Sequence, residues 1–376
     1  MFDIVVFIML LLSPVLAIRL VWYWAKRKNW PISRIENTMV WFFLLTLAPV
    51  YWFLTRDLFV FMNITLNVFY RVIFIIFIFI ASFLITIICF YDIDKNLRRS
   101  EWHLSEYLNY YLRNFVLGYL PLFILLLSGT GLLYVLERLK FISNLLLWLW
   151  GPVLIIILFV GYPQLVMSFM KGYPLSPGAL HDKLMKLKNK TNVHFQDIYC
   201  IDYSKGKITD AWAVGIVPFN RKIFISKYIL NNYSDEEIEA IVAHELGHLK
   251  YNHLLLNLFL AIGYMIFFGL VFHIVSFFIS ITIGISMITG MFCGLIWTII
   301  HSTIKHRNEF QADAYAAQVI GNPQPLIQAL SKLDNLDNKL KFDSAKSSID
   351  IRGKLWKFLQ THPTIEDRIK RLSFRF

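Results

Sequence analysis

Long apolar runs separated by polar segments dominate the first half of the chain. Runs long enough to cross a bilayer, which takes about 20 residues, lie roughly at 4–22, 38–54, 72–91, 115–136 and 143–169. A further apolar region, 254–304, contains no Asp, Glu, Lys or Arg, and its histidines are His273 and His301. As one helix it would be about 76 Å long, more than twice a hydrocarbon core of about 30 Å. We therefore predict a hairpin of two spans turning near 276–284, and seven transmembrane helices in all.

Two polar segments, 171–253 and 305–376, flank this hairpin, which returns the chain to the side it left. They are therefore able to form one domain. The first contains an amphipathic helical pattern followed by strand-like runs, and the second is helical with a Lys/Asp/Ser-rich loop. These predictions fall on Leu180, Leu184 and Leu187 for the helix, on 198–203, 211–217 and 222–226 for the strands, on a turn at 218–221, and on 332–354 for the loop.

Composition supports a membrane protein, since the 376 residues are 57% hydrophobic and 16% aromatic, too apolar for an ordinary soluble domain. The formal net charge of +12 follows the positive-inside rule. Basic residues after the first run predict an uncleaved anchor with its N-terminus outside, so that both polar segments lie in the cytoplasm. This distribution of Lys and Arg disfavours nucleic-acid binding. The three cysteines have the spacing of neither a disulfide framework nor a metal site.

A candidate metal site lies at His244-Glu245-Leu246-Gly247-His248. Ser234 and Glu237 have the spacing of a capping box, and apolar residues follow at helical spacing. On a helix, His244 and His248 project from one face about one turn apart and can hold one zinc ion. Glu245 then lies beside that ion, able to take a proton from water. The alternative is a polar helix face with two ordinary histidines.

A catalytic zinc generally takes three protein ligands. The best third candidate is Glu309, in a helical stretch directly after the hairpin, and Asp313 shares its face four residues on. Asp313 could accept the free ring N–H of a ligand histidine. A solvated acidic face is the alternative for Glu309. We expect His253 to be a polar residue at the membrane boundary without a direct catalytic role.

These motifs, taken in order, resemble the type-1 CaaX prenyl endopeptidase family. The resemblance rests on His-Glu-Leu-Gly-His-Leu-Lys-x-x-His at 244–253, two spans, Glu-Phe-Gln-Ala-Asp-Ala-Tyr-Ala at 309–316, and Thr-His-Pro at 361–363. Members are seven-span membrane zinc metalloproteases, distantly similar to bacterial heat-shock membrane proteases. The resemblance implies a mainly α, polytopic membrane fold carrying a cytoplasmic zincin-like α+β protease domain assembled from two segments.

Carried over to this chain, the resemblance implies that His244, His248 and Glu309 bind one zinc ion and that Glu245 is the catalytic base. It also implies an orienting role for Asp313 and a catalytic role for His362 facing the substrate or transition state. An edge strand for the substrate would contain Asp210, Ala211, Trp212 and Ala213.

Two departures from the family pattern concern the substrate region. Asp210 replaces the usual Asn, and Lys305-His306 stands where a Ser-Arg pair is usual. Arg307 would then supply the missing cation and contact the substrate. Trp212 could instead merely pack in the sheet.

The implied organisation is five transmembrane helices over 1–170, the two halves of the protease domain at 171–253 and 305–376, and the hairpin at 254–304. Partners would be the lipid bilayer and a peptide or protein substrate, either a precursor or a CaaX-type C-terminus, with the plasma membrane as location in bacteria and the endoplasmic reticulum in eukaryotes. Alternatives are a quality-control protease, a protease-like signal transducer and a transporter with a vestigial site. The sequence leaves the oligomeric state open.

Overall fold

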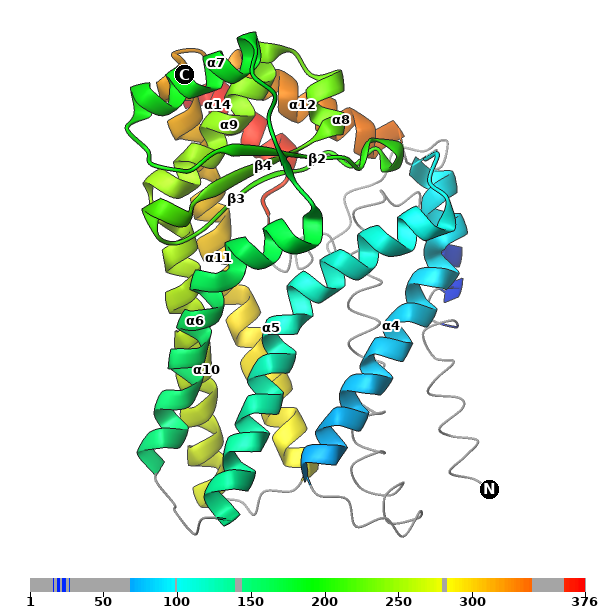
Figure 1. Ribbon diagram of the computed structural model, residues 1–376, viewed down its shortest axis with the longest axis vertical. Coiled ribbons are helices and arrows are strands. Elements are labelled where there is room, and N and C mark those ends of the chain that lie inside the picture. The colour runs from blue at the N-terminus through cyan, green and yellow to red at the C-terminus, as the bar shows by residue number, and fades with distance from the viewer. Residues whose placement is uncertain are drawn as a thin grey trace. The chain divides into compact units, whose positions relative to one another are not determined.

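Helices make up most of the computed structural model (Figure 1), which describes residues 68–98, 100–138, 144–278, 283–339 and 362–375 together with scattered positions between 16 and 27. The chain divides into two compact units. The first comprises Met1–Leu154, Phe272–Thr289 and Asp337–Ser347, and the second Ile155–Val271, Gly290–Leu336 and Ser348–Phe376.

The first unit contains α4 (Val68–Arg98) and α5 (Leu104–Arg138), which pack against each other. Aromatic side chains form much of this contact: the rings of Phe83 and Phe115 stack with centroids 4.0 Å apart, and Phe79 meets Tyr119 edge to face at 5.2 Å. Such ring pairs contribute more than their buried area alone. They join two helices whose other faces are largely apolar.

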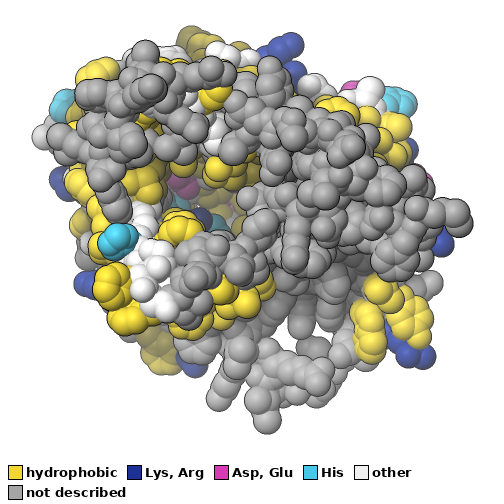
Figure 2. All heavy atoms as spheres, turned by 90° about the horizontal axis from the view of Figure 1, so that it is seen from below, with side chains coloured by type: hydrophobic (Ala, Val, Ile, Leu, Met, Phe, Trp, Pro, Cys, Tyr) yellow, Lys and Arg dark blue, Asp and Glu magenta, His cyan; other side chains and the backbone are white. Residues whose placement is uncertain are grey.

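Long apolar helices make the chain an integral membrane protein. Four helices among the described residues are long and apolar enough to span a bilayer, at Leu104–Leu136, Leu149–Met170, His253–Phe278 and Ile288–Ile320. In the view from below, the described side chains that can be seen are mainly hydrophobic (Figure 2). The predicted run at 72–91 lies within α4, whereas 4–22 and 38–54 fall almost wholly outside the described residues, so the count of seven spans stays a prediction.

The predicted hairpin is seen as two helices. The apolar region forms two helices, α10 (His253–Phe278) and α11 (Ile283–Ile320), and not one. α10 ends and α11 begins within the predicted turn region. The polar helix expected around 309–316 is not separate but the continuation of α11. The position of Glu309 is therefore set by the same helix that carries a candidate membrane span.

A four-stranded sheet in the order β1-β2-β4-β3 lies in the second unit. β4 pairs parallel with β2 and antiparallel with β3, while β1 pairs antiparallel with β2. The interior of β4, from Ile223 to Ile225, is fully buried, as expected for a central strand. β3 is an edge strand. The bounds are β1 (Tyr173–Pro174), β2 (Ile198–Ile201), β3 (Ala211–Val214) and β4 (Lys222–Ser226).

Short helices surround this sheet and complete the core. α9 (Asp235–Lys250) starts with the predicted capping box, in which Ser234 and Glu237 each bond the other's backbone N–H, and it contacts β3 and α7. Its buried apolar residues, among them Leu246 and Leu249, belong to the core of the second unit. The remaining helices are α6 (Asn144–Met170), α7 (Ala179–Thr191), α8 (Lys227–Asn232), α12 (Gln324–Lys339) and α14 (Ile365–Arg375).

One sequence prediction is wrong in part. The loop expected over 332–354 begins instead as helix, because α12 extends to Lys339; residues 340–354 lie outside the described residues. Leu326, Ala329 and Leu330 of α12 are buried in the core. Their packing fixes one face of the helix, so the charged residues that follow remain helical on its exposed side.

Candidate active site and metal centre

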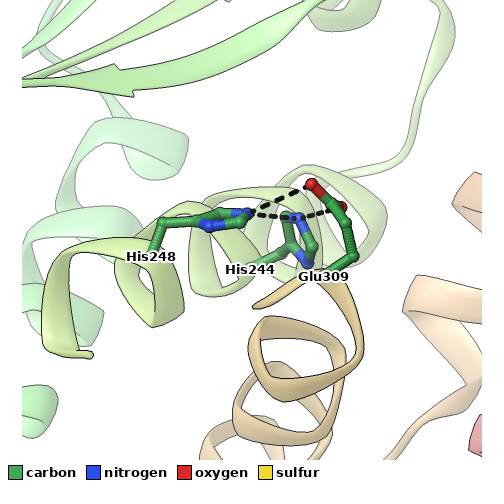
Figure 3. Close-up of side chains that lie close together, drawn as sticks. All are labelled: His244, His248 and Glu309. Carbon is green, nitrogen blue, oxygen red and sulfur yellow. Dashed lines mark hydrogen bonds and ion pairs between the residues drawn. The ribbon is translucent and has the colours of Figure 1, made fainter. Parts of the chain in front are cut away.

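Three side chains from two helices converge at one point of the second unit. His244 and His248 come from α9 and Glu309 from α11, and Figure 3 shows their polar ends directed toward one another. One ligand atom from each lies within 4.8 Å of the others. His244 and Glu309 are buried and His248 is half-buried. Three metal-ligating groups that converge in this way, two of them buried, are the arrangement expected of a metal site.

The separations fit a single zinc ion. Ligand atoms at about 2.05 Å from a tetrahedral zinc lie about 3.3 Å from one another. Here His244 Nε2 is 3.1 Å from His248 Nε2 and 3.4 Å from one carboxylate oxygen of Glu309, Oε2, while His248 Nε2 is 3.8 Å from the other oxygen, Oε1. Two nitrogens and one carboxylate oxygen are also the donor set of a catalytic zinc with a position left for water.

Asp313 fixes the ring of His244. Its Oδ1 lies 2.9 Å from His244 Nδ1, so this nitrogen donates and Nε2 faces the cluster. Burial by itself would lower the pKa of His244, but the hydrogen bonds to Asp313 and Glu309 raise it to about 10. A metal ion and a proton therefore compete for His244 Nε2.

A hydrogen-bonded chain fixes the ring of His248 in the same way. Its Nδ1 lies 2.9 Å from Nδ1 of His253, whose Nε2 is 3.2 Å from Oε1 of Gln311. The amide oxygen can only accept, so His253 donates through Nε2 and must accept from His248 at Nδ1. This leaves His248 Nε2 with a lone pair toward the cluster. Burial and the nearby His244 lower the pKa of His248 to about 3, which keeps that lone pair free.

His253 is thus not simply a polar residue at the membrane boundary. Its side chain is buried and contacts His248 directly, and it begins α10. Its position five residues after His248 was visible in the sequence, but the contact requires the chain to turn at Tyr251 and Asn252, and Asn252 adopts a positive φ of 53°.

Arg368 is a second residue that sequence reasoning missed. It contacts Asp313 through two nitrogens, at 2.6 and 2.9 Å, and its Nη1 lies 3.5 Å from Glu309 Oε2. Burial would lower the pKa of Arg368, but the two carboxylates raise it further above its usual value. A paired, two-point contact of this kind orients both partners. The only signal for it was its position in the helical stretch after Thr-His-Pro.

His362 contacts the cluster through Glu309, and Glu245 follows the ligand His244 on α9. His362 Nδ1 is 3.0 Å from Glu309 Oε1, and more than half of its side chain is exposed. The Glu245 carboxylate accepts a 2.9 Å hydrogen bond from the backbone N–H of Ala213 in β3. Burial raises the pKa of Glu245 to about 7, with Glu309 adding to the rise and His244 and the Ala213 N–H opposing it. Such a carboxyl group can both take and give a proton near neutral pH.

The structure does not bring together all the residues that were expected to line the substrate path. Ala211, Trp212 and Ala213 form β3, and Asp210 precedes it with an exposed side chain. Trp212 stacks on Phe224 of β4 at 5.4 Å, the packing role considered for it. Arg307 lies on another part of α11 and lines a separate cavity. Within the described part of the chain, the cation that contacts Glu309 is Arg368.

Gly247 allows α9 and α11 to approach closely enough for the ligands to meet. A Cβ at this position would lie 2.9 Å from Cα of Ala312, nearer than non-bonded carbons normally come. Gly247→Val should therefore push the two helices apart and weaken zinc binding at least about tenfold, measured by chelator competition. Gly161→Val is the matched control, because a Cβ there meets nothing within 4 Å. Unchanged affinity in Gly247→Val would contradict this role.

Comparisons with known proteins agree with this geometry. A protease HtpX homolog of Campylobacter hominis is 27% identical over 53% of this chain and 75% of its own length. Protease HtpX of Legionella pneumophila is 28% identical over 67% of this chain and 97% of its own. A protein of Schizosaccharomyces pombe named "Probable CAAX prenyl protease 1" is 28% identical over 62% of this chain, which spans about half of that longer relative, 51%.

The fold is that of a known membrane protein structure. The crystal structure of S. mikatae Ste24p aligns with a TM-score of 0.63 over 99% of this chain and 97% of that one, at 18% identity. The model of Peptidase family M48 matches residues 174–375, which contain the sheet, α9 and the whole cluster described above. This chain therefore belongs to peptidase family M48.

Proposed function

We propose that this membrane-embedded peptidase is a zinc-dependent endopeptidase, with His244, His248 and Glu309 as the ligands of one zinc ion. The observation that supports this most directly is the convergence of those side chains, with one ligand atom of each within 4.8 Å of the others, because two imidazoles and a carboxylate are a donor set of catalytic zinc. Zinc, when bound, polarises the scissile carbonyl and makes water easier to deprotonate. Glu245 takes that proton and passes it to the leaving amine.

The free edge of β3 is proposed to hold the substrate. Alternate residues of a strand direct their N–H groups to opposite edges. Since the Ala213 N–H points to Glu245, the N–H groups of Ala211 and Ala213 face away from β4 and toward the catalytic carboxylate. An extended peptide added along this edge would have its backbone beside Glu245. Binding would replace the Ala213 contact and release the carboxylate to act as base.

Substrate class is proposed from the relatives. A peptide or protein precursor and a CaaX-type C-terminus both suit an edge strand that pairs through backbone atoms, because such pairing leaves side-chain identity open. A quality-control role on membrane proteins is the alternative within the same chemistry. Comparing kcat/KM for a farnesylated CaaX peptide with that for the same peptide without the lipid separates these proposals.

Orientation is proposed from charge. Lys and Arg lie mainly in the polar segments that hold the cluster and in the loop at 92–113, and basic loops stay on the inner side of a membrane. The protease domain and C-terminus would then lie in the cytoplasm and the N-terminus outside. His362, half-exposed beside Glu309, is proposed to contact the substrate or the transition state. Asp313 is proposed to orient His244.

Metal removal provides the direct test. Dialysis of the purified full-length protein against a zinc chelator should abolish cleavage of a fluorogenic peptide, and one equivalent of zinc should restore it, because no other described group near Glu245 can polarise the carbonyl as a metal does. Metal content is measured by mass spectrometry in parallel. Undiminished cleavage by protein shown to be free of metal would refute the proposal. Absence of cleavage in the zinc-loaded protein would instead favour the transducer or transporter interpretations.

A further inference from the structure

A second cavity lies on a different part of α11 from the metal cluster. It has a volume of about 530 Å³ and is formed within the second unit by α11, α14 and the segment between α9 and α10. Glu309 is two residues from Arg307, about 200° around the helix, so these two side chains lie on different faces of α11. Its lining consists of Tyr251, Thr303, His306, Arg307, Phe310, Gln311, Ala314, Gln318, Arg371 and Arg375.

The charge of this cavity is one-sided. Three arginines from two helices, Arg307, Arg371 and Arg375, line it together with His306, and the described residues that line it include no Asp or Glu. The guanidinium of Arg371 lies over the ring of Phe310, 4.5 Å from the centroid, which holds it in the cavity wall. Guanidinium groups bind phosphate through two parallel N–H donors. Tyr251, Gln311 and Gln318 add neutral polar groups to the same wall.

Depth along the helices places the cavity at the membrane boundary. Tyr251 lies two residues before α10 starts at His253, and Thr303 lies next to Ile304, the last residue of the apolar part of α11. Both helices are candidate membrane spans. One end of the cavity is therefore at the level of the lipid headgroups, where Tyr and Arg side chains concentrate, and basic pockets beside transmembrane helices bind anionic headgroups.

We propose that this cavity binds the phosphate group of an anionic phospholipid, through Arg307, Arg371 and Arg375. The ligand chemistry is a phosphate with a net negative charge at headgroup depth. A free phosphate in solution offers the same chemistry but would gain nothing from the position of the cavity at the membrane boundary.

The test measures lipid affinity and does not depend on peptidase activity. Full-length protein in a neutral detergent is titrated with phosphatidylglycerol or phosphatidylcholine, and bound lipid is counted by native mass spectrometry. Phosphatidylglycerol should bind more tightly. Each basic residue near an anionic lipid contributes about fivefold, so the Arg371→Gln/Arg375→Gln double variant should lose about 30-fold in phosphatidylglycerol affinity and little in phosphatidylcholine affinity.

A control with the same change in charge is Lys186→Gln/Lys370→Gln, which removes exposed lysines that do not line the cavity; it should retain the wild-type affinity. If the double arginine variant fails to fold, Arg307→Gln should still lose about fivefold. Equal affinity of the wild-type protein for both lipids, or equal losses in the arginine and lysine variants, would overturn the proposal. If inorganic phosphate alone saturated the cavity and phosphatidylglycerol did not compete with it, the proposal that the bound phosphate belongs to a lipid would be overturned.

Discussion

Glu245→Gln should leave zinc bound and lower kcat for peptide cleavage by about three orders of magnitude, within the range for loss of a general base. Gln has the same shape and can still meet the Ala213 N–H, 2.9 Å away in the native chain, but it cannot take a proton from water. His244, His248 and Glu309 are unchanged, so metal content should stay at one equivalent. The measurements are single-turnover cleavage and metal analysis of the same sample.

Glu236→Gln is the matched control for that variant. It makes the same chemical change on the same helix, but Glu236 is exposed in the first turn of α9, away from the cluster, so activity should stay within a few-fold of wild type. Full cleavage activity in Glu245→Gln would exclude this residue as the base. Loss of zinc along with activity would show instead that Glu245 supports the metal site.

Glu309→Gln is expected to have the second-largest effect, the loss of bound zinc and with it of cleavage. The substitution removes the anionic ligand and leaves two histidines, fewer than the three protein ligands a catalytic zinc takes. Zinc affinity should fall by more than the 10- to 100-fold typical when a partner of a ligand is lost. Competition with a chromophoric chelator measures the change.

Asp313→Asn supplies the comparison that identifies Glu309 as a ligand. Asp313 touches His244 at 2.9 Å but is not among the three converging groups, so its loss should cost only about 10- to 100-fold in zinc affinity. Glu366→Gln, on exposed α14 surface, should have no effect. Equal losses in the Asp313 and Glu309 variants would contradict the assignment of Glu309 as third ligand.

Local spacing carried much of the prediction. His244 and His248 are one helical turn apart, and Glu309 and Asp313 likewise, so each pair had to share a face once its segment was helical. The capping box at Ser234 and the strands near 198, 211 and 222 were read from neighbouring residues in the same way. Such features depend on residues a few positions apart, which is why they can be read without a structure.

The partners of those side chains could not be read in this way. The Glu245 to Ala213 contact joins residues 32 positions apart, Arg368 to Asp313 spans 55, and His253 to Gln311 spans 58. Each of these contacts depends on how the helices cross and on the order of the strands in the sheet. The close crossing of α9 and α11 itself depends on the small Gly247. The family resemblance favoured Arg307 as the cation of the site, whereas α14 places Arg368 against Glu309.

By itself, the sequence determined that this is a membrane protein whose candidate zinc ligands lie at helical spacing on two segments flanking an apolar hairpin. Only the tertiary structure decided that α9 and α11 bring the three ligand atoms within 4.8 Å, that the edge of β3 faces Glu245, and that Arg307 lines a separate basic cavity. The physical reason is that periodicity and charge act along the chain, whereas ligand convergence and cavity shape arise from packing between segments distant in sequence.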